Sequence, residues 1–231
     1  MSGIFLIRAF AFLFLPLIFA SLVILFDKTV TTRERRLEVF LIYLFSFSAA
    51  GGIAGAMGHL FASDVVARSI GWETGSPFQL EIGFANLAFG ILAAIAVGRR
   101  DGFREATIIG WTFFSVGAVI VHILDIAKTG NLAPGNTLIN LTNLGRPALM
   151  IYLLWALRRE ERDGGTEAGS PEFLYWQSSE AALGGITGAA VGIGLGIGLA
   201  VNQPTIGLVA GLIIGTALGL VSRRRARTAV G

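Results

Sequence analysis

The sequence predicts an all-α integral membrane protein, a helical bundle of seven transmembrane helices. Hydrophobic residues make up 54% of the 231 residues and charged residues only 14%, whereas soluble proteins carry about 25% charged residues. The mean hydropathy is +0.71. So few charges cannot cover a water-facing surface of this size, and we therefore expect a lipid bilayer to surround most of the chain.

Seven apolar stretches reach or approach the length that crosses about 30 Å of hydrocarbon at about 1.5 Å per residue. They are expected at residues 4–26, 38–61, 79–97, 105–127, 137–157, 181–201 and 205–221. A polar stretch at 158–180 divides them. The predicted organisation is thus a five-helix body (1–157), a cytoplasmic linker (158–180) and a two-helix hairpin with a basic tail (181–231).

Basic residues are distributed unevenly among the predicted loops. Alternate loops hold 14 of the 18 Lys and Arg residues, and the positive-inside rule places such loops in the cytoplasm. We therefore expect a multi-pass protein of the plasma membrane, with its N-terminus outside and its C-terminus in the cytoplasm. No basic-aromatic surface indicates nucleic acid, and the absence of cysteine excludes thiolate metal sites. No phosphate-binding loop, GxSxG or HExxH motif is present.

Glycine recurs at every fourth position in both helices of the predicted hairpin. The first stripe is Gly184, Gly188, Gly192 and Gly196, and the second is Gly207, Gly211, Gly215 and Gly219. Small residues at this spacing let helix backbones approach closely within a membrane. We expect the two stripes to pair as a glycine zipper. Gly194 and Gly198 lie on a second face, so packing within one chain and homo-oligomerisation through this tail both remain open.

Polar side chains of the body gather on the outer side of the predicted bundle. Nine of them are candidate ligand-binding residues: His59, Gln79, Glu81, Asn86, His122, Asp125, Asn140, Asn143 and Arg146. Ionisable groups inside a bilayer are costly and indicate a functional site by default. We expect an outward-facing polar pocket among the second to fifth helices.

Spacing groups several of these residues on shared helix faces. His122 and Asp125 are separated by one helical turn, and Gln79 and Asn86 are seven residues apart. Asn136, Asn140 and Asn143 follow the i, i+4, i+7 pattern of a single amide stripe. Glu81 lies near the start of its helix, where the helix dipole favours an anion.

Arg146 is the candidate nearest the bilayer midplane. Side chains lean toward the N-terminus of their helix, which is the outer end for this one, so the guanidinium should reach toward the amide stripe. Either Glu81 or Asp125 could supply its anionic partner. Pro147 follows directly and could kink the helix.

Part of the body resembles a prokaryotic multi-pass membrane family of unknown function. The likeness is carried by Ile70-Gly71-Trp72, Gly75-Ser76-Pro77-Phe78-Gln79, Glu81, Gly83, Ala85-Asn86-Leu87, the surroundings of His59 and His122, and Asn131–Asn136 with Pro134-Gly135. The likeness covers roughly residues 40–157. The same part of the chain resembles small DoxX-like helical bundles more loosely. The resemblance implies a helical membrane body and no particular reaction. Relatives carry an acidic residue where this chain has Asn140, which weakens any carboxylate-dependent mechanism.

Three functions are consistent with these features. The leading hypothesis is a protein that binds or translocates a small polar or ionic solute through the outer pocket. The first alternative is a membrane redox subunit that holds haem or a metal through His59 and His122. The second is an accessory subunit that docks on a larger complex through the hairpin. The sequence does not decide among cofactors, nor whether the protein is an enzyme.

Overall fold

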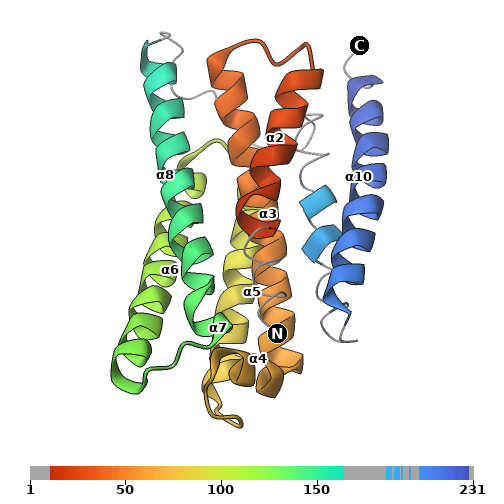
Figure 1. Ribbon diagram of the computed structural model, residues 1–231. Helices are drawn as coiled ribbons and strands as arrows, with labels where there is room; N and C mark the ends of the chain where they lie inside the picture. The colour runs from red at the N-terminus through yellow and green to blue at the C-terminus, as the bar shows by residue number, and fades with distance from the viewer. Residues whose placement is uncertain are drawn as a thin grey trace.

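The computed structural model describes residues 11–163, 186–188, 190–192, 194, 198 and 203–228, and regular structure in this part of the chain is entirely helical. The predicted all-α fold is confirmed. Figure 1 shows long helices running side by side in one bundle, with two short helices, α4 and α7, at one end. The elements are α2 (Leu15–Phe26), α3 (Arg33–Phe61), α4 (Ser63–Ile70), α5 (Phe78–Val97), α6 (Gly102–Thr129), α7 (Pro134–Thr137), α8 (Ile139–Asp163) and α10 (Pro204–Thr228).

Three of the described helices are long and apolar enough to cross a membrane, namely α3, α5 and α6. Two shorter apolar helices are Leu15–Phe26 and Thr205–Val221. These helices indicate a membrane protein, but the seven predicted spans are not confirmed. The helix that holds most of the fifth predicted span, α8, contains Arg146 and ends in a charged last turn beyond that span. Most of the sixth span lies outside the described residues.

Two of the helices extend beyond the predicted spans. α3 begins at Arg33 rather than residue 38, because the Thr32 side chain caps it by accepting a 3.2 Å hydrogen bond from the Arg35 backbone N–H. α8 continues to Asp163, so the first residues of the predicted linker are helical. The rest of that linker lies outside the described residues.

The loop between the second and third predicted spans contains a helix that we did not expect, α4. It ends at Gly71, whose φ of 80° is the left-handed conformation that glycine adopts most easily at a helix C-terminus. The fifth predicted helix is likewise divided into α7 and α8 around Leu138. Both short helices lie at the same end of the bundle (Figure 1).

α3 is the central helix of the bundle. The apolar stretch of α3 that could cross a membrane is 78% buried inside the protein, compared with 28% for that of α5 and 33% for that of α6. One apolar cluster packs it against α2 and α10, and another packs it against α5, α6 and α8. Gly52 of α3 and Gly90 of α5 meet directly: a Cβ built on Gly52 would lie 2.7 Å from Gly90 Cα. Larger side chains at either position would force the two helices apart.

The hairpin glycines pack differently from the prediction. A Cβ on Gly192 would lie 2.7 Å from Ala50 Cα, and Gly188 is equally tight against α3. The described members of the first stripe therefore face α3 rather than the second stripe. The second stripe instead meets the residues beside the first, since a Cβ on Gly211 would lie 2.5 Å from Ala190 O.

Gly194 also belongs to this contact. We expected it on a second face that could meet another helix or another subunit, and it meets α10, because a Cβ there would lie 2.9 Å from Gly211 Cα. The tail is thus packed onto the body of its own chain. Homo-oligomerisation through the tail remains a prediction.

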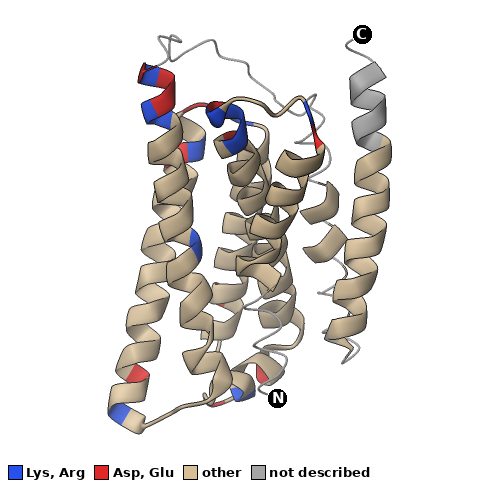
Figure 2. Cartoon of the chain, turned by 45° about the horizontal axis from the view of Figure 1, so that its top comes forward, with Lys and Arg blue, Asp and Glu red and all other residues tan. Residues whose placement is uncertain are grey.

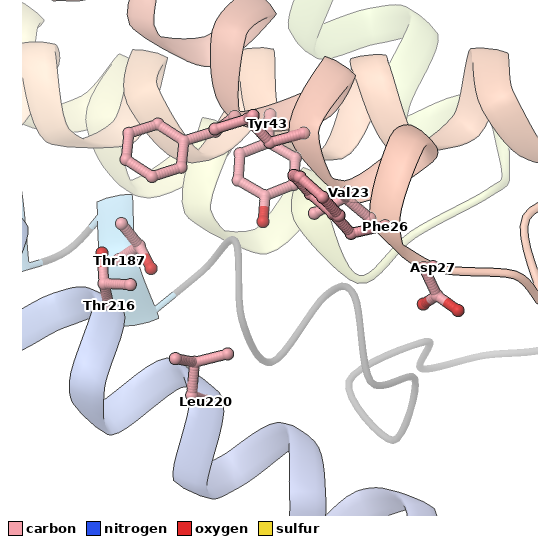
Figure 3. Close-up of a pocket in the computed structure, with 9 residues that line it drawn as sticks. Val23, Phe26, Asp27, Tyr43, Thr187, Thr216 and Leu220 are labelled. Atoms are coloured by element: carbon pink, nitrogen blue, oxygen red, sulfur yellow. The ribbon is translucent and has the colours of Figure 1, made fainter.

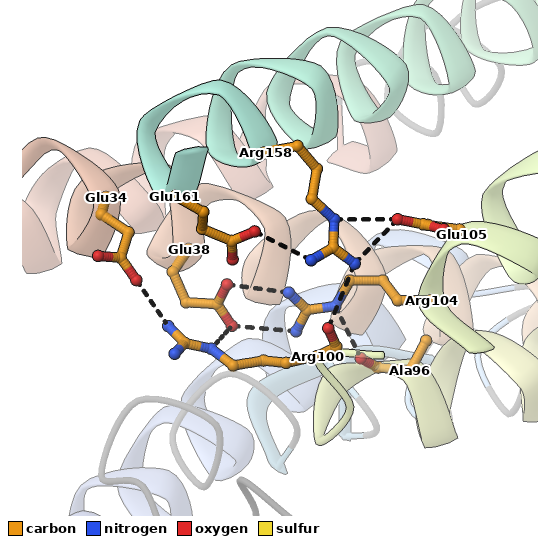
Figure 4. Close-up of polar contacts among 8 residues, drawn as sticks. All are labelled: Glu34, Glu38, Ala96, Arg100, Arg104, Glu105, Arg158 and Glu161. Carbon is orange, nitrogen blue, oxygen red and sulfur yellow. Dashed lines mark hydrogen bonds and ion pairs between the residues drawn. The ribbon is translucent and has the colours of Figure 1, made fainter. Parts of the chain in front are cut away.

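Charged residues gather at the two ends of the bundle and leave the middle almost uncharged (Figure 2). At the end opposite α4, the fully buried carboxylate of Glu38 accepts two hydrogen bonds from the buried guanidinium of Arg104, at 2.9 and 3.0 Å. Arg104 Nε also lies 3.4 Å from Ala96 O, and Arg100 Nε lies 3.5 Å from Glu38. Figure 4 shows this cluster joining α3, α6 and the loop before α6.

A second set of ion pairs brings α8 into the cluster. Arg158 donates to Glu105 of α6 and to Glu161 of α8, each at 2.9 Å (Figure 4). Arg33 Nη1 lies 2.7 Å from Glu160, which links the start of α3 to the end of α8. The sequence places Arg104 in a basic cytoplasmic loop, and in the structure its charge is neutralised inside the protein by Glu38.

The connection between α5 and α6 is short and locally fixed. The Asp101 carboxylate caps α6 by accepting a 3.1 Å hydrogen bond from the Phe103 backbone N–H, and it also pairs with Arg99. The Arg99 guanidinium holds the pKa of Asp101 below its usual range. The two helices are therefore held together at this end.

The Glu38–Arg104 pair yields a stability prediction. The Glu38→Gln variant leaves a buried guanidinium without its counter-charge, which should lower the free energy of unfolding by about 3–5 kcal/mol. Glu34→Gln is the matched control, because Glu34 is partly exposed and lies 3.8 Å from Arg100; it should cost less than about 1 kcal/mol. Denaturant unfolding in neutral detergent measures both, and equal losses would contradict the assignment.

Candidate functional site

A cavity of about 760 Å³ lies among α3, α4, α5, α6 and α8, within the size range of sites for small molecules. Five of the nine predicted ligand-binding residues line it: His59, Asn86, His122, Asn143 and Arg146. They come from α3, α5, α6 and α8, which are four of the helices that the sequence assigned to the pocket. Residues far apart in the sequence are therefore brought to one chamber.

Arg146 is the most unusual group in the wall of this cavity. Its side chain is buried, with 8% of the residue exposed, and its Nε atom has no hydrogen-bond partner. The guanidinium carbon lies 5.6 Å from the centre of the Trp111 ring and 5.9 Å from that of Phe12. Aromatic faces attract a cation, but they supply no full negative charge.

Neither predicted anionic partner reaches Arg146. Glu81 is exposed and does not line the cavity, because it lies in the first turn of α5 on the side away from the chamber. The Asp125 carboxylate is used by other donors. Among the described residues, no carboxylate forms an ion pair with Arg146.

Asp125 is the centre of a hydrogen-bond network at the α4 end of the cavity. Its Oδ2 atom accepts from Trp72 Nε1 at 3.0 Å, from Asn131 Nδ2 at 2.7 Å and from Asn136 Nδ2 at 2.9 Å. Asn131 also donates to the backbone oxygen of Ile70 at 2.9 Å. The network therefore ties the end of α4 and the segment before α7 to α6.

This network fixes the orientation of His122. Asn136 is fully buried and uses its amide nitrogen to donate to Asp125 and to Asn131 O, so its Oδ1 atom must face His122 as an acceptor. His122 Nδ1 lies 2.6 Å from that oxygen and must carry the proton. In the neutral ring, Nε2 is then an acceptor. The ring stacks on Trp72 with centroids 5.4 Å apart.

His59 and Gln79 form a second pair, between α3 and α5. His59 Nδ1 lies 2.8 Å from Gln79 Oε1, and Gln79 is 2% exposed. His59 lines the cavity and Gln79 does not. Gln79 thus acts only by orienting the His59 ring. Asn86 lies in α5, seven residues after Gln79. Its amide nitrogen donates to Ile82 O at 2.9 Å, which leaves its amide oxygen as an acceptor.

The predicted amide stripe is only partly continuous. Asn136 faces His122, Asn140 donates to Asn136 O at 3.1 Å, and Asn143 reaches the cavity. The buried Oδ1 atom of Asn140 has no partner. The break at Leu138 separates Asn136, in α7, from Asn140 and Asn143, which both lie in α8.

Sequence reasoning missed the aromatic and hydroxyl residues of the wall. Phe12, Trp72, Trp111, Ser115 and Thr142 all line the cavity. Trp72 belonged to the stretch that carries the family resemblance, which was a usable signal. Phe12 and Trp111 lie in uniformly apolar segments, where nothing distinguishes a residue beside a buried cation from an ordinary core residue.

A smaller pocket of about 190 Å³ lies between α2, α3 and α10. Figure 3 shows Tyr43 facing Thr187 and Thr216 across it, with Val23 and Phe26 on the side of α2. Thr187 Oγ1 donates to Gly215 O at 3.3 Å. Almost all of its lining is apolar and it holds no buried cation, so we regard it as a packing crevice.

Comparison with known proteins gives one match. A protein-family model described as a family of unknown function (DUF6790) matches residues 8–163, a longer range than the roughly 40–157 over which we noted a resemblance. The matched range ends where α8 ends and leaves α10 outside. No curated protein and no solved structure matches the chain.

The orientation of His122 is directly testable. We expect the neutral His122 ring to carry its proton on Nδ1, because Asn136 offers only an oxygen there. The chain has two histidines, so nitrogen NMR of histidine-labelled protein should give two imidazole spin systems, and His59→Gln assigns them. A proton on Nε2 of His122 would contradict the network. Asn136→Leu should remove the preference for Nδ1.

Proposed function

The chain belongs to this family of unknown function, and we propose that its cavity binds a small solute carrying a negative charge, with Arg146 as the main contact. The single observation that supports this most strongly is a buried guanidinium without a counter-ion among the described residues. The rest of the proposal follows from the groups around it. Candidate ligand contacts are Arg146, His122, Asn86 and Asn143.

Electrostatics supports an anionic ligand. Moving a charged group out of water costs several kcal/mol unless an opposite charge or hydrogen bonds replace the lost hydration. Arg104 meets this requirement through Glu38, whereas Arg146 does not meet it with described protein groups. An anion in the cavity would supply both the charge and the hydrogen-bond acceptors that Arg146 lacks.

The remaining polar groups of the wall favour a ligand that also offers a hydrogen-bond donor. Asn86 presents an amide oxygen, and His122 presents Nε2 as an acceptor in its neutral form. A solute with an anionic group and a hydroxyl, amine or protonated acid would satisfy both kinds of contact. Few polar groups in a largely apolar wall are typical of selective small-molecule sites.

We place the α4 end of the bundle outside the cell. The opposite end holds the basic residues around the start of α3, between α5 and α6, and in the last two turns of α8, which the positive-inside rule assigns to the cytoplasm. In that orientation the cavity lies toward the outer side, and the Glu38–Arg104 cluster closes the cytoplasmic end. Binding from outside is the core of the proposal, and translocation would require that cluster to open.

The haem or metal alternative is less well supported. His59 and His122 both line the cavity, and no group of three or more potential ligand side chains is found among the described residues. This counts against a metal ion held by side chains alone, whereas a haem would need only the two histidines as axial ligands. An absorption spectrum and a metal analysis of gently purified protein test this alternative. A Soret band lost on His122→Ala would replace the anion proposal with a redox function.

Replacing Arg146 tests the proposed function. In the Arg146→Met variant, affinity for anions such as benzoate, phosphate or acetate should fall at least about 30-fold, because truncating one partner of a buried charge pair costs about 2–5 kcal/mol. Calorimetric titration in a neutral detergent gives the affinities. Arg159→Met is the matched control on the same helix, since Arg159 is exposed at the far end of α8.

Thermal unfolding separates a binding role from a structural one. Without ligand, Arg146→Met should unfold at the same or a higher temperature than the wild type, because it removes an uncompensated buried charge. A large fall in unfolding temperature would show that Arg146 holds the bundle together. Wild-type protein that no anion binds would overturn the proposal.

A further inference from the structure

We infer that the ligand of this cavity is an amphiphile, with its anionic head at Arg146 and an apolar chain leaving between α5 and α6. The inference rests on the proposed function and narrows the ligand class. It is drawn from the difference in exposure between the residues of the cavity wall, from the place where the wall opens, and from the cavity volume.

The residues of the wall range from buried to largely exposed. Arg146 and Trp111 are each 8% exposed, so the charged end is deep. Phe78, Val121 and Phe113, which also line the cavity, are 40%, 46% and 78% exposed. Val65 of α4, at 59%, is the other exposed large apolar residue of the described lining, and we take the three side chains on α5 and α6 as the rim toward lipid. A ligand that follows this wall outward passes from a cation to an apolar surface.

The rim lies on helices that are apolar enough to cross a membrane. α5 and α6 are two of the three such helices in the described part of the chain. They touch through Phe89, whose ring lies 5.7 Å from Trp111 and 5.0 Å from Phe114. Farther along α6, Gly117 lines the cavity, is exposed, and has no atom within 4 Å of the position a Cβ would take.

The opening at Gly117 therefore faces the surface that would contact acyl chains in a membrane. A solute that entered from water would have no need of an apolar exit there. An amphiphile gains from it, since each methylene moved from water to apolar surroundings contributes about 0.8 kcal/mol. The geometry thus favours a ligand that stays partly in the hydrocarbon layer while its head is bound.

The cavity volume agrees with this ligand class. At about 760 Å³, the cavity lies in the upper half of the range of small-molecule sites, which is about 300–1,000 Å³. An inorganic anion would fill only a small part of that space and would leave the apolar wall uncovered. An anionic head with several attached methylenes fills it and covers the rim.

A homologous series of straight-chain carboxylates tests the inference. Affinity should increase about three- to fourfold for each added methylene, from acetate up to about ten carbons, in protein held in a neutral detergent. Partition of long chains into detergent affects all variants equally, and Arg146→Met measures that background. A flat series with binding that still depends on Arg146 would overturn the amphiphile while leaving the proposed function intact.

Filling the opening tests its position. Gly117→Leu places a side chain where a Cβ has open space, so the fold should tolerate it. The variant should lose the gain with chain length, so that decanoate binds at least tenfold more weakly than it does to the wild type. Gly102→Leu is the matched control, because Gly102 lies on the same helix, also has open space and does not line the cavity.

The outcomes are distinct. Loss of chain-length dependence in Gly117→Leu alone supports the exit between α5 and α6. Unchanged dependence in Gly117→Leu overturns that exit. A phospholipid with an anionic headgroup, presented in nanodiscs, distinguishes a membrane lipid from a free fatty acid as the source: competition by either one identifies the amphiphile, and competition by neither overturns the inference.

Discussion

A buried ion pair at one end of the bundle is the interaction on which the arrangement of the long helices depends. Glu38 and Arg104 are both buried, and their two hydrogen bonds join α3 to α6. Arg158 adds α8 to the same cluster. These contacts hold the long helices together at one end, while the opposite end is spanned by α4, α7 and a network of neutral amides around a single carboxylate. The cavity lies between these ion pairs and the α4 end of the bundle.

The two buried arginines make this contrast concrete. Arg104 and Arg146 are similar in burial, at 1% and 8% exposure, and both lie near aromatic rings. Only Arg104 has a carboxylate among the described residues. A bundle that needed Arg146 solely for packing would be more stable with an apolar side chain there. This contrast is the basis of our proposal that the charge of Arg146 is half of an interaction whose other half is a ligand.

Much of this arrangement could be predicted from sequence, and the parts that could not have a common physical cause. Periodic apolar stretches located the long helices, and the rarity of polar residues in them identified Arg146, His122, His59, Asn86 and Asn143 as neighbours. The partner of Arg146 could not be predicted, because the direction of Glu81 depends on how α5 turns about its axis. The pairing of Glu38 with Arg104 was hidden for a similar reason: both lie at predicted span ends, where charge ordinarily faces headgroups. Contacts between helices depend on rotation and tilt, and spacing along one helix determines neither.

Two of the four tryptophans of the chain lie in the wall of the cavity. Trp111 faces the guanidinium of Arg146, and the indole of Trp72 stacks on His122 while its N–H donates to Asp125. Indole emission is sensitive to nearby charge and to the polarity of its surroundings. The protein thus carries two intrinsic optical reporters in the wall of its chamber. Each can be read separately in a variant in which the other three tryptophans are replaced by Phe. Occupancy of the chamber can be followed by light alone, without a labelled ligand and before the ligand has been identified.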